Sequence, residues 1–518
     1  MVSRWTYITL TMLLCVELGE SRTFRAAVLE HALHLPNRSF VVSRQQALAY
    51  AEPNLVEFER EAATARAQNV DILVTPEDGI YGMGYKRAVL RPYLETIPDP
   101  KHVTWNPCTA SAHIPNVDVQ RRLSCIARDN DLYLVANYGD MQPCSILTDS
   151  NCPSDGHYQY NTDIVFDPNG TLIARYHKKH LFFEDQFDEP AEAENIVFET
   201  PFGKFGVFTC FDIMFDKPAI SLIQDLGVGN IVFPTAWMDA LPFLAAVEFH
   251  SAFAMGMGVN FLAANIHRPE YRFHGSGIYT SDGAAVYYYN DTVSPGGGKL
   301  LVADIQVLDK PTRRLGNDQT KPVSSMLSVD QYEFKSYAFN DLFNFVSLRD
   351  SNVDEIKVCH NALCCHAKYT ADIHEGDTYA VGAFDGLHTY EGQYYLQICT
   401  VLKCANSSFS SCGSPTLDAR SVFSSINIWG TFSTPYVFPE VLMSDKGSLV
   451  LAQTQLSFKN GTLDTRNPLD LPLLSATVFG RKYSLDDGHG YYTPSGSNSH
   501  DSCVLALFLS LVSMKLLL

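Results

Sequence analysis

Basic residues are scarce in this chain. Its 518 residues include 38 lysines and arginines against 57 aspartates and glutamates, which gives a formal net charge of −19 and a pI near 5.2. Nucleic acids and anionic lipid surfaces repel a protein of this charge. The composition therefore argues against either of them as a binding partner.

A hydrophobic tail ends the chain, but it is short for a membrane-spanning helix. The run from Cys503 to Leu518 contains Lys515 and falls below the roughly 20 apolar residues that a spanning helix needs. Small residues and a short polar spacer precede this run, as in a glycosylphosphatidylinositol (GPI) attachment signal. We expect residues 488–518 to be that signal, with attachment at Ser495 or Gly496. A plain tail anchor and a secreted chain are the alternatives.

The N-terminus carries a second apolar run, which follows Arg4 and extends from Tyr7 to Val16. Small and polar residues come next, and the pattern predicts a secretory signal peptide over residues 1–21. We therefore expect the protein on the extracellular face of the cell membrane, attached only by a lipid anchor, with shedding or secretion as a further fate. Sequons for N-glycosylation fit that compartment at Asn37, Asn169, Asn290, Asn406 and Asn460.

The cysteine count predicts one free thiol. Of the 13 cysteines, Cys15 leaves with the signal peptide and Cys503 with the tail, so an odd number remains in an oxidising compartment. Five disulfides and one free thiol is the simplest solution. Cys210 stands between two even sets and is the natural candidate for that thiol. The sets are Cys108, Cys125, Cys144 and Cys152, and Cys359, Cys364, Cys365, Cys399, Cys404 and Cys412.

The run Cys364-Cys365-His366 has no second pair at the spacing of a zinc site, so disulfides are the better interpretation. We therefore expect no metal here.

The chain is too long for one ordinary core, and its patterns divide it in two. Residues 22–306 alternate between strand and helix patterns, which predicts an α/β domain. A polar, proline-containing stretch over 307–336 is the expected linker. Residues 337–487 contain β-favouring runs and six cysteines, which predicts a β-rich, disulfide-held domain. No internal repeat is present.

Three polar residues each follow a predicted strand, and the ends of strands are where α/β proteins often carry functional residues. Cys210 ends the apolar run that begins at Lys204, at a turn expected to expose its sulfur beside backbone N–H groups. Glu77 follows a buried strand over 70–75, and Lys178 follows a strand over 172–176. The alternatives are a buried core cysteine, an exposed turn carboxylate and a solvated lysine.

The surroundings of these residues resemble the nitrilase (carbon–nitrogen hydrolase) superfamily. Lys178-Lys179-His180-Leu181-Phe182 looks like its lysine motif, and Phe208-Thr209-Cys210-Phe211-Asp212 like its cysteine motif. The similarity covers essentially the whole mature chain and narrows to the vanin and biotinidase branch. That branch is matched by Thr75-Pro76-Glu77-Asp78-Gly79, Tyr158-Gln159-Tyr160-Asn161-Thr162, Phe233-Pro234-Thr235-Ala236-Trp237-Met238, Gly275-Ser276-Gly277-Ile278-Tyr279 and Phe384-Asp385-Gly386-Leu387-His388-Thr389.

The anchor signal and the segment 252–257 favour the vanins, which are pantetheinases. The resemblance implies an α-β-β-α four-layer sandwich and a vanin-type C-terminal domain. It also implies hydrolysis of the carboamide bond of pantetheine to pantothenate and cysteamine, without a cofactor. Cys210 would be the nucleophile, Glu77 the proton acceptor, and Lys178 the proton donor and oxyanion stabiliser.

Two other functions remain open. A biotinidase would cleave biocytin or biotinyl amides with the same chemistry, and a non-catalytic ectodomain would serve adhesion at the cell surface. A papain-like protease is disfavoured because its local signature around the cysteine is absent.

Overall fold

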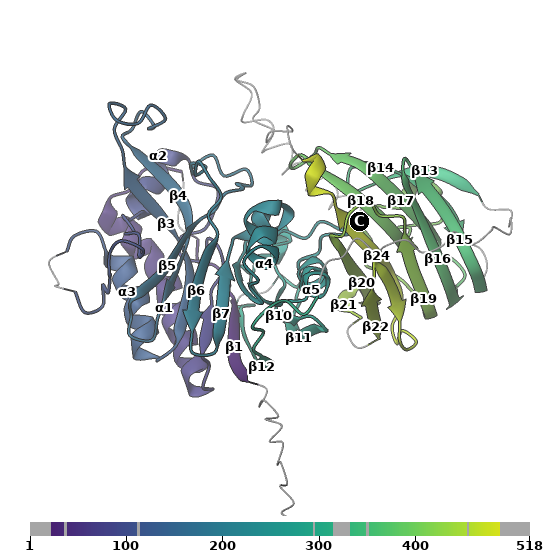
Figure 1. The fold of residues 1–518 in the computed structure, drawn as a ribbon, viewed down its shortest axis with the longest axis horizontal. Coiled ribbons are helices and arrows are strands. Elements are labelled where there is room, and N and C mark those ends of the chain that lie inside the picture. The colour runs from purple at the N-terminus through teal and green to yellow at the C-terminus, as the bar shows by residue number, and fades with distance from the viewer. Residues whose placement is uncertain are drawn as a thin grey trace, which may run out of the picture.

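The computed structural model describes residues 22–486 except 36–38, 111–113, 294–295, 314–331, 349–351 and 453–454. The expected signal peptide, the GPI signal with Ser495 and Gly496, Asn37 and most of the expected linker lie outside the described residues. Figure 1 shows an N-terminal domain, coloured purple to teal, beside a C-terminal domain, coloured green to yellow. In the part of the chain that the structure describes, no helix is long and apolar enough to cross a membrane.

Two sheets of six strands form the centre of the N-terminal domain. Both are mixed, with parallel pairs at their centres and antiparallel strands at their edges. In spatial order, the first contains β12 (Lys299–Gln306), β1 (Thr23–Glu30), β2 (Ile72–Val74), β3 (Tyr133–Pro143), β4 (His157–Phe166) and β5 (Leu172–His177). The second contains β11 (Gly283–Tyr288), β10 (Ser276–Thr280), β9 (Asn260–Ala264), β8 (Asn230–Pro234), β7 (Gly203–Val207) and β6 (Ile196–Thr200).

The two sheets pack face to face, and helices cover their outer faces. Buried apolar residues of the central strands, such as Val74, Val135 and Val207, belong to one core cluster between the sheets. A second cluster joins the first sheet to α1 (Arg44–Ala67) and α3 (Asp118–Asp129). Helices α4 (Ser221–Gln224) and α5 (Ala246–Met257) lie against the second sheet, while the short α2 (Arg87–Leu90) lies near the end of the first. The expected α-β-β-α sandwich is confirmed.

Local sequence signals explain where these helices begin and end. Ser43 and Gln46 form a capping box at the start of α1. The helix then continues through Pro53 without a break. Helix α5 begins at Ala246, whose N–H donates to Asp239 Oδ1 at 2.7 Å. The helix ends at Gly258, whose φ of 70° suits glycine.

Two antiparallel sheets form the C-terminal domain, as predicted from its β-favouring runs. A third core cluster fills the space between them. The larger contains β13 (Glu333–Ala338), β14 (Asp341–Leu348), β17 (Tyr379–His388), β18 (Tyr394–Lys403), β24 (Leu473–Arg481), β20 (Val437–Asp445) and β21 (Ser448–Leu451). The smaller contains β15 (Asn352–His360), β16 (Leu363–Asp372), β19 (Val422–Gly430), β23 (Thr462–Thr465) and β22 (Leu456–Lys459). Strand β13 begins before residue 337, the expected start of this domain.

Helix α5 joins the two domains through aromatic contacts. Phe249 packs edge-on against Phe438 of β20 and Phe479 of β24, and Phe253 also packs on Phe438. Elsewhere at the boundary, Phe243 stacks on Phe343 of β14 at 5.6 Å. One face of the larger C-terminal sheet therefore packs against the N-terminal domain.

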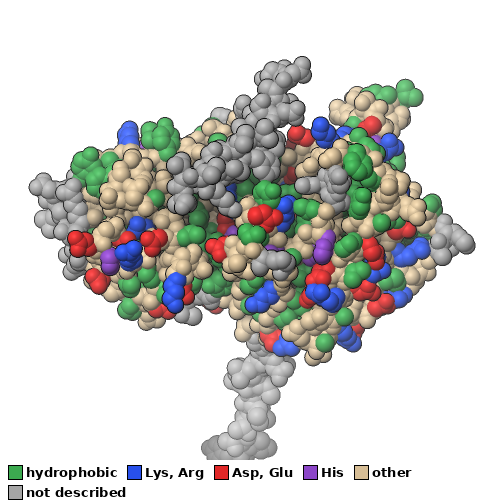
Figure 2. Space-filling model, turned by 180° about the vertical axis from the view of Figure 1, so that it is seen from behind, with side chains coloured by type: hydrophobic (Ala, Val, Ile, Leu, Met, Phe, Trp, Pro, Cys, Tyr) green, Lys and Arg blue, Asp and Glu red, His purple; other side chains and the backbone are tan. Residues whose placement is uncertain are grey.

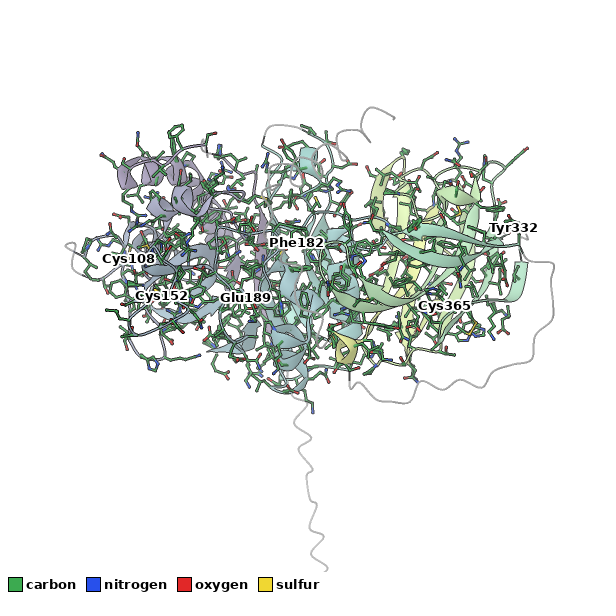
Figure 3. The ribbon with its side chains drawn as sticks, turned by 90° about the horizontal axis from the view of Figure 1, so that it is seen from above. Cys108, Cys152, Phe182, Glu189, Tyr332 and Cys365 are labelled. Atoms are coloured by element: carbon green, nitrogen blue, oxygen red, sulfur yellow. A yellow bond between two sulfur atoms is a disulfide. The ribbon has the colours of Figure 1, made fainter. Side chains whose placement is uncertain are left out.

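The predicted disulfide count is confirmed among the described residues. The pairs are Cys108–Cys125, Cys144–Cys152, Cys359–Cys364, Cys365–Cys399 and Cys404–Cys412. Cys210 is the free cysteine of the described chain. Both cysteines of the run Cys364-Cys365-His366 are thus used in disulfides. Figure 3 places Cys108 and Cys152 at the far end of the N-terminal domain and Cys365 inside the C-terminal domain. Such pairing indicates an oxidising, extracellular environment.

Candidate active site

The structure brings Glu77, Lys178 and Cys210 together at the strand ends where the sequence placed them. Glu77 follows β2, Lys178 follows β5, and Cys210 follows β7 of the facing sheet. Their side chains are buried, with exposed fractions of 2% for Glu77, 2% for Lys178 and 6% for Cys210. The alternatives of an exposed turn carboxylate and a solvated lysine are therefore excluded.

Glu77 is held by one charged and two neutral donors. Its Oε1 accepts hydrogen bonds from Lys178 Nζ at 2.7 Å and from Asn161 Nδ2 at 2.8 Å. Its Oε2 accepts from the backbone N–H of Ala236 at 2.8 Å. These contacts fix the orientation of the carboxylate, which is what a general base needs.

A second carboxylate, Glu184, also contacts Lys178. Its Oε2 accepts from Lys178 Nζ at 2.5 Å and from the Phe182 N–H at 3.0 Å, and its Oε1 accepts from Asn161 Nδ2 at 2.6 Å. Burial lowers the pKa of Lys178, but the charges of Glu184 and Glu77 more than offset this and raise its pKa well above the ordinary value. Lys178 therefore remains an ammonium at neutral pH.

Sequence reasoning missed Glu184. It lies in a polar loop after the lysine motif, where an acidic residue ordinarily faces solvent. The contact with Lys178 depends on the path of that loop, and no periodic pattern reveals it.

The turn that carries Cys210 is strained and strongly held. Cys210 has a φ of 47°, in the left-handed region that non-glycine residues seldom adopt. A capping box between Thr209 and Asp212 closes the turn. The Asp212 carboxyl also accepts from Tyr176 OH at 2.7 Å and from the His180 N–H at 2.8 Å. Strained residues persist where their surroundings over-determine them, and they cluster at active sites.

Contrary to expectation, the turn buries the sulfur. Burial, and then the charge of Glu77, raises the pKa of the Cys210 thiol well above its ordinary value, while Lys178, the Thr235 hydroxyl and the Ala236 N–H act in the opposite direction. The resting group is thus a neutral thiol with a carboxylate nearby. This arrangement favours proton transfer to the carboxylate as the sulfur attacks.

Buried amides connect Glu77 to the cysteine turn. Asn161 Oδ1 accepts from Asn137 Nδ2 at 2.6 Å, and the same Asn137 nitrogen donates to Asp163 Oδ1 at 2.9 Å. Asp163 Oδ2 accepts from Thr209 Oγ1 at 2.6 Å. Burial raises the pKa of Asp163 to about 8. The network links Glu77 to Thr209, the residue that precedes Cys210.

Four histidines that could serve a papain-like protease have hydrogen-bond partners elsewhere or lie in the apolar core. His177 contacts Asp140, His180 contacts the Lys217 carbonyl and His267 contacts Glu30. His250 is fully buried among aromatic rings.

The predicted sequons within the described residues lie at the surface. Asn169, Asn406 and Asn460 are exposed, and Asn290 is half-buried. Their glycosylation remains a prediction.

Acidic, basic and hydrophobic side chains are interspersed over the face of the molecule shown in Figure 2.

This fold and site define a carbon–nitrogen hydrolase. The carbon-nitrogen hydrolase family matches residues 41–246, and the Vanin C-terminal domain matches residues 332–486. The chain belongs to the vanin and pantetheinase family of the nitrilase superfamily, and it is a hydrolase of linear amides.

Comparison with two relatives by sequence supports this assignment. The chain is 49% identical to the pantetheinase of Mus musculus over 91% of this chain and 92% of that protein. It is 40% identical to the biotinidase of Mus musculus over 90% of this chain and 94% of that protein. A solved amidase from Nesterenkonia sp. is 22% identical, covers 57% of this chain and 94% of its own, and has a TM-score of 0.39.

Proposed function

We propose that this protein hydrolyses pantetheine to pantothenate and cysteamine, with Cys210 as nucleophile, Glu77 as base and Lys178 as oxyanion stabiliser. The main observation in support is the buried contact of Lys178 Nζ with Glu77 Oε1 at 2.7 Å. The free thiol of Cys210, in its strained turn, lies beside this pair. Greater similarity to pantetheinases than to biotinidases supports the choice of substrate.

The first half-reaction forms a thioester. The sulfur of Cys210 attacks the amide carbonyl carbon while Glu77 takes the thiol proton. The carbonyl oxygen becomes an oxyanion, which the ammonium of Lys178 and a backbone N–H of the turn stabilise. The C–N bond then breaks, and the leaving cysteamine nitrogen receives the proton from Glu77.

The second half-reaction releases the acid. Glu77 takes a proton from a water molecule, whose oxygen attacks the thioester carbonyl. The C–S bond breaks, pantothenate leaves, and the sulfur regains its proton from Glu77. Glu184 keeps Lys178 charged and in place through both halves, because the two share a buried hydrogen bond.

A paired assay tests the substrate. Purified wild-type protein and the Cys210→Ala variant are incubated with pantetheine and, separately, with biocytin, while released cysteamine and lysine are measured. Cysteamine release by the wild type alone supports the proposal. Preferential lysine release assigns the biotinidase function, and hydrolysis of neither substrate leaves the adhesion ectodomain as the better interpretation.

We also propose that a GPI anchor at Ser495 or Gly496 holds the enzyme on the extracellular face of the membrane. The small-residue site, polar spacer and apolar tail support this. Treatment of expressing cells with a phosphatidylinositol-specific phospholipase should release the enzyme into the medium. Retention on the cells would favour a spanning tail instead.

A further inference from the structure

A buried arginine of the C-terminal domain contacts the cysteine turn. Arg481 is the last residue of β24, and its side chain is completely buried. Its Nε donates a hydrogen bond of 2.8 Å to the carbonyl of Met214. Met214 is the last residue of the turn Cys210–Met214, so this contact closes the end of the turn opposite to the nucleophile.

Arg481 is itself rigidly placed within the C-terminal domain. Its Nη1 donates to the Tyr395 carbonyl at 2.5 Å, and its Nη2 forms an ion pair with Asp486. Its guanidinium also lies over the rings of Tyr394 at 5.0 Å and Tyr483 at 4.6 Å. A planar guanidinium with this many fixed partners has little freedom to follow a moving turn.

A second contact from the same domain supports the residue next to Cys210. The ring of Phe211 packs edge-on against Tyr394 at 6.3 Å. Gly392 lies so close that a Cβ there would meet Phe211 Cζ at 3.0 Å. Glu391 anchors this loop because it accepts hydrogen bonds from the Tyr394 hydroxyl and from His388 Nε2. Figure 3 shows Phe182, which packs on Phe211, between the two domains.

The strain at Cys210 explains why such support matters. A left-handed residue with a side chain costs about 1–3 kcal/mol and persists only where neighbouring contacts hold it. Thr209 and Asp212 hold the start of the turn from inside the N-terminal domain. The contacts at Phe211 and Met214 come from the other domain.

We propose that Arg481 is a positioning residue for catalysis, through which the C-terminal domain holds the nucleophile turn in its reactive geometry. The proposal rests on the assignment of Cys210 as the nucleophile of the proposed function. On this proposal, the C-terminal domain contributes to catalysis as well as to the stability of the fold. A misplacement of about 1 Å can reduce an enzymatic rate by about a hundred-fold.

Arg481→Lys is the first test, because lysine keeps the buried positive charge beside Asp486 but lacks the fork that reaches Met214. We expect kcat for pantetheine, per titrated Cys210 thiol, to fall by about ten-fold to a hundred-fold while KM changes by less than about two-fold. Phe438→Leu is the matched control, since Phe438 packs on α5 at the same domain boundary. It should lower the melting temperature and leave kcat per thiol unchanged. Equal losses in both variants, or none in Arg481→Lys, would overturn the proposal.

Alkylation of Cys210 by iodoacetamide separates this proposal from the substrate assignment. The reaction needs the aligned thiol and its base but no pantetheine, so it can be measured even if the wild type fails to hydrolyse pantetheine. We expect Arg481→Lys to slow alkylation by about ten-fold, because a displaced sulfur loses its base. Gly392→Ala, which leaves Arg481 intact and displaces Phe211, should also slow it. A faster or unchanged rate in both variants would mean that the contacts only close the domain boundary, and would refute the positioning role.

Discussion

Lys178 Nζ lies 2.7 Å from Glu77 Oε1, and each of these side chains is only 2% exposed. A charge buried at such a site is tolerated because its partner neutralises it, and loss of one partner leaves the other uncompensated. Substitutions in this pair therefore change both chemistry and stability. Activity must be measured per folded molecule, with the melting temperature determined for each variant.

The two carboxylates beside Lys178 should differ in their effect on the rate. We expect Glu77→Gln to reduce kcat by about 10²- to 10⁴-fold, the usual contribution of a general base. Glu184→Gln should reduce it less, because Glu184 acts through Lys178 and an amide can still accept the hydrogen bond. Cysteamine release per titrated thiol measures both variants. A larger loss in Glu184→Gln than in Glu77→Gln would make Glu184 the base.

Lys178→Arg should also inactivate the enzyme. The ammonium is a compact charge between two carboxylates, and a planar guanidinium cannot occupy that space and still meet one oxyanion. Loss of one oxyanion donor costs about 3 kcal/mol, or about a hundred-fold or more in kcat. Lys179→Arg is the matched control, because Lys179 is partly exposed and pairs with Glu189. Retention of most activity by Lys178→Arg would remove Lys178 from the oxyanion site.

Much of the fold and the three central site residues could be predicted from the sequence. Glu77, Lys178 and Cys210 each follow an apolar strand pattern and lie in a motif typical of the superfamily. The odd cysteine count identified the free thiol independently, and the structure pairs the other described cysteines.

The other features of the site depend on contacts between distant parts of the chain, which no local sequence pattern encodes. Glu184 joins the site because its loop folds back onto Lys178. Arg481 lies 267 positions from Met214, and only the docking of the two domains brings them together. The burial of the Cys210 sulfur was likewise missed, because a strand-to-helix turn exposes its residue unless other chain segments cover it.

Strain at Cys210 predicts which of two inactive variants is the more stable. Cys210→Gly and Cys210→Ala should both be inactive, because each lacks the sulfur of the proposed nucleophile. Glycine adopts a φ of 47° without the penalty that a Cβ imposes, so Cys210→Gly should be the more stable of the two by about 1 kcal/mol. Chemical denaturation measures the difference. A glycine variant that is less stable than the alanine variant would show that the turn is not strained.

Two buried glutamates, Glu440 and Glu248, lie at the domain boundary. Glu440 of β20 is 1% exposed, and neither of its carboxyl oxygens has a hydrogen-bond partner among the described residues. Burial, and then the charge of Glu248, raises the pKa of Glu440 well above its ordinary value. Burial also raises the pKa of Glu248, whose Oε1 accepts from Ser475 Oγ at 3.1 Å.

A raised carboxyl pKa makes the folded state bind a proton that the unfolded state releases. The stabilisation of the folded state by this proton is therefore fully present below the unfolded pKa of about 4.5. As the pH rises towards the folded pKa, the stabilisation is lost by about 1.4 kcal/mol per pH unit for one group. Glu440→Gln cannot ionise, so its free energy of unfolding should fall less steeply between pH 5 and 8 than that of the wild type. Denaturation at several pH values measures these slopes. Glu199→Gln, at an exposed site on β6, is the control and should keep the wild-type slope. Identical slopes for Glu440→Gln and the wild type would show that Glu440 is already ionised in the folded protein.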